Sequence, residues 1–166
     1  MNRKNRAPLK TGRVIVNFRR QSDIETDDGA IVNCMTKGRR LQPVCGDIVQ
    51  WRPLDDNGHE DNNRGVIEAI EPRRSLLFRY DPRKQQQPLA ANLDQLLIVS
   101  APQPTLEPFL IDKYLVAAEA INVTPVIVLN KIDLLTAPDQ YNGLLAEYQQ
   151  LGYTTLQVSA ENGTGM

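Results

Sequence analysis

The chain has 166 residues, 41% of them hydrophobic and 23% charged, which is enough for one ordinary domain or two small ones. No apolar run approaches the roughly 20 residues of a membrane-spanning helix. The basic start is followed by polar sequence rather than by the apolar core of a signal peptide. These features argue against a membrane or secreted protein, and we expect a cytoplasmic one.

The overall charge of −1 conceals an asymmetry. Residues 1–90 hold 17 Lys and Arg against 12 Asp and Glu, a net charge of +5. Residues 91–166 hold 2 against 8, a net charge of −6. The split indicates two modules with different partners, and the basic module is suited to a polyanion.

The first module, residues 1–80, consists of short alternating strands separated by turn signals. Five such strands fit a small closed barrel, for which the OB-fold is the common five-stranded case, although an SH3-like barrel fits the pattern nearly as well. The expected strands are 13–18, 30–35, 47–51, 64–70 and, as a possible fifth, 75–79.

Residues 81–90, with three glutamines before Pro88, are typical of a linker or mobile loop. From residue 91 the pattern alternates between buried-type strands and amphipathic helices. This order predicts a parallel sheet with crossover helices, so the fold class is an OB-type β-barrel followed by a partial α/β domain over 91–166. The expected elements are strands at 96–99, 126–129 and 154–158 and helices at 107–121 and 138–151.

The tetrapeptide Asn130-Lys131-Ile132-Asp133 follows directly on an apolar strand, at the carboxyl end where open α/β sheets bind ligands. An aspartate there accepts hydrogen bonds from N1 and N2 of guanine, whereas adenine has an acceptor at N1 and no 2-amino group. Asn130 would bond to the purine edge, and the Lys131 stem would lie along the base or ribose. Unpaired buried polar groups reject the wrong base by about 10⁴-fold. The motif therefore predicts a GTP site, with a solvated loop as the alternative.

A second signal lies one strand further on, where Ser159 and Ala160 follow the run 154–158. The pair resembles the Ser-Ala of Ras-like GTPases, in which a backbone N–H is offered to guanine O6. Ser-Ala alone carries little information. Its position one βαβ unit after the Asn130 motif makes it a strong signal.

No segment carries the phosphate-binding pattern G-x-x-x-x-G-K-[ST]. The spacing Asp55 to Gly58 matches D-x-x-G, but no apolar strand precedes it, so we interpret it as a turn. His59 lies in the same polar loop and is interpreted as solvated. Cys34 and Cys45 lack the spacing of a zinc site, so no metal site is expected in this chain.

Taken together, the sequence resembles the circularly permuted, small-subunit-dependent ribosomal GTPases, the RsgA or YjeQ family. The resemblance spans nearly the whole chain and includes the Asn130 and Ser159 motifs. It also rests on the segments 43–51, 73–77, 90–95 and 111–115.

The resemblance implies an OB-fold, then guanine-reading motifs, then a P-loop, and finally a zinc-binding domain. The intact protein would hydrolyse GTP, use GTP or GDP with magnesium, and act on the small ribosomal subunit and its RNA, as a monomer. The chain ends before the P-loop, and zinc is expected only in the domain beyond it. We therefore expect the 166-residue chain to be inactive alone, with no catalytic residue of its own.

For the barrel, the resemblance implies contact with ribosomal RNA, which the basic excess supports. Trp51 could stack on a base, but a tryptophan that ends an alternating strand is more often a core residue. An alternative function is a plain RNA-binding module whose α/β segment is only a scaffold. The candidate RNA contacts are Arg13, Arg19, Arg20, Lys37, Arg39, Arg40 and Arg52.

Overall fold

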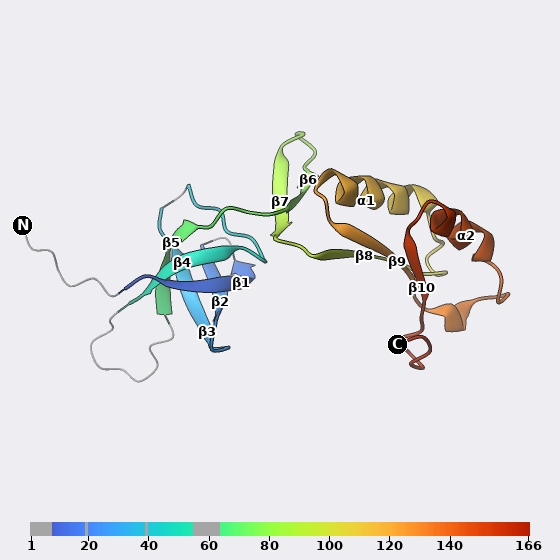
Figure 1. The fold of residues 1–166 in the computed structure, drawn as a ribbon, viewed down its shortest axis with the longest axis horizontal. Coiled ribbons are helices and arrows are strands. Elements are labelled where there is room, and N and C mark those ends of the chain that lie inside the picture. The colour runs from blue at the N-terminus through green and yellow to red at the C-terminus, as the bar shows by residue number, and fades with distance from the viewer. Residues whose placement is uncertain (1–7, 19, 39, 55–63) are drawn as a thin grey trace, which may run out of the picture. The chain divides into compact units, whose positions relative to one another are not determined.

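The computed structural model describes residues 8–18, 20–38, 40–54 and 64–166, and the chain divides into two compact units, Met1–Leu93 and Asp94–Met166 (Figure 1). The first unit contains a closed five-stranded barrel and the second a parallel sheet with helices. The predicted fold class is confirmed.

The barrel strands follow the order β1-β2-β3-β5-β4, and β4 closes the sheet by pairing with β1. The β3–β5 pair is parallel, whereas every other pair in the barrel is antiparallel. Closure leaves no exposed sheet edge, which is how an OB-type barrel avoids pairing with other chains. The strands are β1 (Lys10–Phe18), β2 (Gln21–Thr26), β3 (Ile31–Thr36), β4 (Ile48–Pro53) and β5 (Arg64–Ile70).

The barrel interior is filled by alternate side chains from all five strands. Trp51 is only 3% exposed and belongs to this core, as the more frequent interpretation of its position predicted. Gly65 lets the strands approach, because a Cβ atom there would lie 2.6 Å from the Trp51 ring and 2.7 Å from Cys34 Sγ. The fully buried members of the core include Val14, Ile24, Val49 and Ile67.

Two strand predictions for the barrel were wrong. Strand β2 was missed because Ile24 is the only large apolar residue that it turns inward, beside Ser22, whose hydroxyl bonds to Asn17 Oδ1 at 3.1 Å. The expected fifth strand at 75–79 does not belong to the barrel. It is β6 (Leu76–Tyr80), which pairs with β7 (Gln86–Ala91) in a separate two-stranded sheet.

The β6–β7 hairpin also differs from the linker or mobile loop expected at 81–90. Its turn is closed by Asp81, whose Oδ1 accepts the N–H groups of Arg83 and Gln85, both at 2.8 Å. Pro88 fits the strand because it lies at a register irregularity, where a missing donor is tolerated. Gln86 and Gln87 are thus exposed strand residues, and Gln85 belongs to the turn.

A buried ion pair holds the segment that leaves the barrel. Asp47 is fully buried and accepts bonds from Arg73 Nε at 2.8 Å, Arg73 Nη2 at 2.9 Å and the Val44 N–H at 2.8 Å. The bonds and charge of Asp47 raise the pKa of Arg73 against the opposing effect of burial. A buried carboxylate is tolerated only with such complete pairing.

The second unit is a three-stranded parallel sheet in the order β10-β9-β8. The two helices pack on one face, where Ile98 and Ile127 meet Ile111, Leu115 and Leu145. The bounds are β8 (Gln95–Ser100), α1 (Pro108–Ala120), β9 (Thr124–Leu129), the 3₁₀ helix η1 (Ile132–Leu134), α2 (Asn142–Gln150) and β10 (Thr154–Gln157).

The opposite face of this sheet is open and apolar. Val99, Val128 and Leu156 lie side by side in register, and Leu97 lies beside Val126. Leu97, Val99 and Leu156 are 56%, 60% and 46% exposed. Parallel sheets are ordinarily covered on both faces, so this face, defined here as the open sheet face, is unusual.

Candidate functional site

The predicted guanine motifs meet at the carboxyl ends of the three strands. The Asn130 N–H donates to the Ser100 carbonyl at the end of β8, at 2.8 Å. Beyond β10, the Val158 N–H donates to the Leu129 carbonyl at 2.9 Å, and the Ile132 N–H donates to the Val158 carbonyl at 3.2 Å. Backbone bonds therefore fix both loops against each other.

Asn130 joins the two loops through one oxygen atom. Its Oδ1 accepts the N–H of Lys131 at 2.7 Å and the N–H of Ala160 at 3.2 Å. Lys131 adopts a left-handed conformation with φ of 60°, which turns the chain sharply after β9. Its exposed side chain is free to lie along a ligand above the loop.

Asp133 is oriented by Ser159 from the neighbouring loop. The Ser159 hydroxyl, which is fully buried, donates to Asp133 Oδ1. Asp133 itself is exposed within η1, so its carboxylate has lone pairs left for a ligand at the sheet edge. All five predicted residues, Asn130, Lys131, Asp133, Ser159 and Ala160, thus lie together.

A short turn after Ser159 completes the edge and was not predicted from the sequence. The Ser159 N–H donates to the Thr164 carbonyl at 2.8 Å, and the Gly163 N–H donates to the Ser159 carbonyl at 2.9 Å. Gly165 has φ of +73°, and a Cβ atom there would lie 2.4 Å from the Gln157 carbonyl oxygen. In the sequence, the glycines at 163 and 165 are the feature that could have predicted this turn.

This arrangement offers both kinds of hydrogen-bonding group that a guanine edge requires. The Asp133 carboxylate is an acceptor for two adjacent donors, and the Ala160 N–H is a donor that its Asn130 partner already orients. Adenine presents the opposite pattern at the positions these groups would meet. The geometry is therefore chemically suited to guanine.

The predicted RNA contacts fall into two groups in the described structure. Arg20 and Arg40 are exposed and form no ion pair with another described residue. Arg13 is exposed on β1, opposite Glu25 of β2 in register. Arg19 and Arg39 lie outside the described residues, as do His59 and the turn at 55–58.

Lys37 and Arg52 are instead engaged by one carboxylate on β5. Glu68 Oε1 lies 3.4 Å from Lys37 Nζ and 3.2 Å from Arg52 Nε. Partial burial opposes the charged form of Glu68, but the bonds and charges of Lys37 and Arg52 outweigh it and lower its pKa. These two cations are therefore less available to a phosphate than Arg20 and Arg40.

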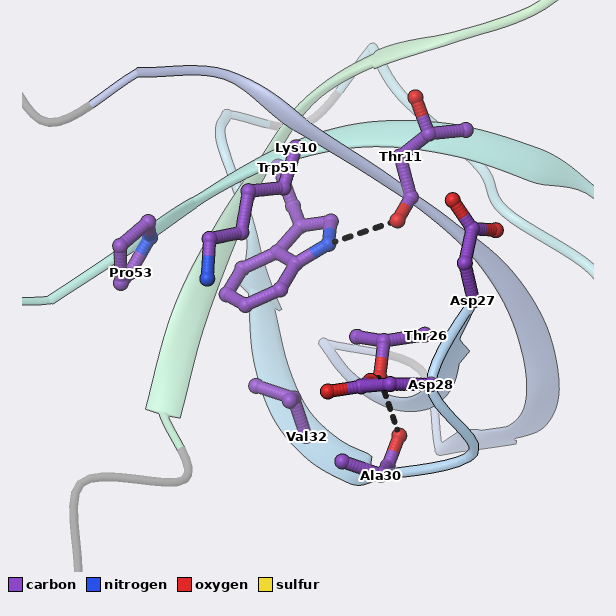
Figure 2. A pocket seen from close by; sticks show the side chains of 9 residues that line it. All are labelled: Lys10, Thr11, Thr26, Asp27, Asp28, Ala30, Val32, Trp51 and Pro53. Atoms are coloured by element: carbon purple, nitrogen blue, oxygen red, sulfur yellow. Dashed lines mark hydrogen bonds between the residues drawn. The ribbon is translucent and has the colours of Figure 1, made fainter.

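A concavity of about 530 Å³ lies at one end of the barrel and was not predicted (Figure 2). The Lys10 ammonium lies 5.6 Å from the centroid of the Trp51 ring, whose Nε1 donates to the Thr11 carbonyl at 3.3 Å. Asp27 and Asp28 line the opposite side. The Thr26 hydroxyl, followed by backbone N–H groups, lowers the pKa of Asp28. Two carboxylates make this end of the barrel unfavourable for RNA phosphates.

Within the described part of the chain, no group of three or more His, Cys, Asp or Glu side chains is placed to hold a metal ion. None of the described helices combines the length and apolarity needed to cross a membrane.

The RsgA GTPase family model matches residues 70–166, more than half of the chain. The chain belongs to the RsgA GTPase family. The resemblance stated from the sequence is thereby confirmed, and the matched region includes Asn130, Asp133 and Ser159.

The relatives extend this match into the barrel. The small ribosomal subunit biogenesis GTPase RsgA of Sodalis glossinidius is 43% identical over 157 residues, covering 93% of this chain and 45% of the relative. The protein of the same name from Azotobacter vinelandii is 42% identical over 165 residues, covering 96% and 46%. This RsgA-family chain therefore spans less than half the length of these relatives.

A solved structure supports the fold of both units. The crystal structure of YjeQ from Thermotoga maritima is similar with a TM-score of 0.69 and 29% identity. The similarity covers 95% of this chain and 54% of that one. The barrel and the parallel sheet thus occur in the same order in another protein.

Proposed function

We propose that this chain is the RNA-binding and guanine-reading part of a GTPase that acts in biogenesis of the small ribosomal subunit. The observation that carries the proposal is the bonded constellation of Asn130, Asp133, Ser159 and Ala160 at the edge of the parallel sheet. The names of its relatives support the reaction and the ribosomal role.

In the proposed site, Asp133 accepts bonds from N1 and N2 of guanine while Ser159 holds the carboxylate in place. The Ala160 N–H donates to O6, exchanging its bond with Asn130 Oδ1 for one with the base. Asn130 bonds to the purine edge and, by accepting the Lys131 N–H, braces its own loop. The Lys131 stem covers the base or ribose. These residues select the nucleotide and perform no step of hydrolysis.

Phosphate and magnesium binding belong, in this proposal, to the part of the longer protein that this chain does not span. The chain carries no P-loop pattern. The described residues also hold no cluster of acidic or imidazole side chains suited to a metal ion. Hydrolysis depends mainly on positioning and electrostatic stabilisation of the transferred phosphoryl group. We therefore propose that the 166-residue chain does not hydrolyse GTP and that zinc, too, is bound only in the longer protein.

The open sheet face supports this division. Strands β8, β9 and β10 follow one another across the sheet in a single direction, and both connecting helices lie on the same face. Parallel crossovers are right-handed in about 98% of cases. A further strand at the free edge of β8 would therefore send its crossover helix over the open sheet face. We propose that the remainder of the longer protein packs there, in the circularly permuted order.

The barrel is proposed to contact ribosomal RNA, principally through Arg20 and Arg40, which no described carboxylate neutralises. A factor with this role would work in the cytoplasm, and we propose that the full-length protein is a monomer. The alternative, an RNA-binding module with the α/β unit as scaffold, is favoured by one observation: the barrel alone is closed within this chain.

Nucleotide titration of the chain by NMR separates the two functions. We expect GDP, and not ADP, to shift the amide signals of Ala160 and Asp133 at about millimolar concentration, since the phosphate contacts that usually dominate affinity are missing. Asp133→Asn should prefer xanthosine diphosphate, because an amide donates to the 2-oxo group. Asp139→Asn, also exposed, is the matched control. If no nucleotide shifted these amide signals, the alternative of an RNA-binding module with the α/β unit as scaffold would be the better account.

The GTPase proposal itself is tested in the full-length protein, by measuring GTP hydrolysis with and without small ribosomal subunits. Stimulation by the subunit, with altered purine preference in Asp133→Asn, is the expected result. Absence of hydrolysis in a folded full-length protein under both conditions would refute it.

A further inference from the structure

The outer face of the barrel carries an exposed row that includes an aromatic ring. Phe18 is 64% exposed and Met35 is 52% exposed. Phe18 pairs in register with Gln21, and Gln21 pairs with Met35. Directly opposed residues in antiparallel strands point to the same side. These three side chains therefore form one row across β1, β2 and β3, defined here as the Phe18 row.

The neighbouring row on the same face runs from Val16 through Asp23 to Asn33. Asp23 pairs in register with Asn33, and Asn33 Nδ2 donates to Asp23 Oδ1 at 2.7 Å. This bond holds the carboxylate against the Asn33 side chain. Gln21 in the Phe18 row is exposed and supplies an amide donor and acceptor of the kind that bonds to base edges.

Positive charge lies at the end of the Phe18 row. The Arg20 N–H donates to the Phe18 carbonyl at 2.5 Å, and the Thr36 N–H donates to the Arg20 carbonyl at 3.1 Å. These bonds hold the β1–β2 turn against the end of β3. Arg20 is exposed and forms no ion pair with any other residue in the described ranges, so its guanidinium is available to an anion.

We infer that the Phe18 row is a stacking platform for unpaired RNA bases, with Arg20 contacting the adjacent phosphate. The inference rests on the proposed RNA-binding function and names its substrate class as single-stranded RNA. An aromatic ring stacks on any base whose face is free, and the outer face of strands 2 and 3 is where OB-folds bind oligonucleotides. A duplex keeps its bases stacked on each other and offers the ring no such face.

Fluorescence anisotropy with labelled RNA tests the substrate class. The chain should bind an unpaired strand of about 12 nucleotides more tightly than a duplex of the same length, since an OB-fold covers about 4 to 16 nucleotides. Phe18→Ala should weaken binding of the unpaired strand by about 10-fold, within the range measured for single stacked bases. Phe18→Tyr should retain it.

Phe109→Ala is the matched control, because Phe109 is 79% exposed on α1 in the other unit. Its affinity for both RNAs should equal that of the unsubstituted chain. Since both phenylalanines are exposed, neither substitution should alter the Trp51 fluorescence that reports a folded barrel. The dependence of affinity on salt then separates stacking from charge.

Phe18→Ala should leave the slope of log affinity against log salt unchanged, whereas Arg20→Gln should reduce it by about 0.7. Equal affinity for strand and duplex, or unchanged affinity in Phe18→Ala, would overturn the platform but leave RNA binding intact. If the unsubstituted chain bound neither RNA, both proposals would fail. Loss of self-association in Phe18→Ala, without a change in RNA affinity, would instead assign the row to a contact between copies.

Discussion

The barrel and the parallel sheet of this chain differ in how completely they bury their apolar surfaces. The barrel closes on itself through the β1–β4 pair and encloses its core, so its strands offer no free edge. The sheet has α1 and α2 on one face, while the other exposes Leu97, Val99 and Leu156. Two units of similar size therefore have different structural requirements.

The difference indicates where each unit's function lies. A closed barrel pairs all of its own strand edges, so its outer side chains are available for recognition. A parallel sheet with one bare face lacks a covering layer, and the edge that carries Asn130 and Asp133 is the part of it proposed to read guanine. The proposed division between RNA binding and guanine reading follows from this contrast.

The largest expected effect comes from two adjacent residues of β8. Ile98 is buried beneath the helices, whereas Val99 is 60% exposed on the open sheet face. Ile98→Lys should unfold the second unit, since an unpaired buried ammonium costs more than the several kcal/mol that stabilise a small domain. Val99→Lys should change its free energy of unfolding by about 0.5 kcal/mol or less.

Circular dichroism of the helical signal measures this contrast, because every described helix lies in the second unit. Sedimentation should also show less self-association in Val99→Lys, since the substitution interrupts an exposed apolar patch. Equal losses of helical signal in the two variants would mean that the open sheet face is buried in solution.

A smaller effect is expected in the barrel unit at Arg73. Arg73→Met leaves the fully buried Asp47 carboxylate without its cation and should destabilise the barrel by about 3 kcal/mol. Urea unfolding followed by fluorescence of Trp51, the only tryptophan, measures the loss. Arg83→Met, at the exposed hairpin turn, is the control and should change the midpoint little. A normal midpoint in Arg73→Met would show that Asp47 is satisfied without the cation.

The sequence predicted most of this architecture where apolar periodicity was strong. The buried strand before Asn130, and the Asn130 and Ser159 motifs themselves, lie where the pattern placed them. The sequence analysis missed strand β2 because a barrel strand can turn a serine inward when a neighbouring side chain bonds to it. Ser22 does so by donating to Asn17. Such a contact joins separate strands and leaves no periodic signal.

The hairpin and the ion pairs were unpredictable for related reasons. Gln85 to Pro88 has linker composition, yet Asp81 closes a turn that converts part of it into strand. The engagement of Lys37 and Arg52 by Glu68 depends on the pairing of β5 with both β3 and β4. Composition identified the candidate cations. Only the strand order showed which of them are paired with a carboxylate and which remain available to an RNA phosphate.

The proposed guanine site ends in a glycine pair that distinguishes backbone strain from steric overlap. Gly163 and Gly165 have φ of +78° and +73°, but only at Gly165 would a Cβ atom meet backbone, at 2.4 Å. Both alanine variants should lose about 1 kcal/mol to left-handed strain, and Gly165→Ala should lose about 1 kcal/mol more. Only Gly165→Ala should shift the Ala160 amide signal, measured by NMR. An unchanged Ala160 signal in Gly165→Ala would mean that the turn does not set the Ala160 N–H.

A dependence of barrel stability on pH is also expected. Burial, with a contribution from the charge of Asp23, raises the pKa of the Cys34 thiol to about 12, against 9.0 for an exposed thiol. As pH rises past 9, the unfolded chain loses this proton while the folded chain retains it, so stability present below that pH is lost above it.

At about pH 10 the loss should reach about 1.4 kcal/mol, one unit of pH beyond the unfolded pKa. Other groups titrate in the same range, so the measurement is the difference between variants in urea unfolding at about pH 7 and pH 10. Cys34→Ala should lack this component, whereas Cys45→Ala, which removes an exposed thiol, should keep it. The same pH dependence in both variants would mean that the barrel opens enough for Cys34 to ionise, and that its closure is less complete than its strand order implies.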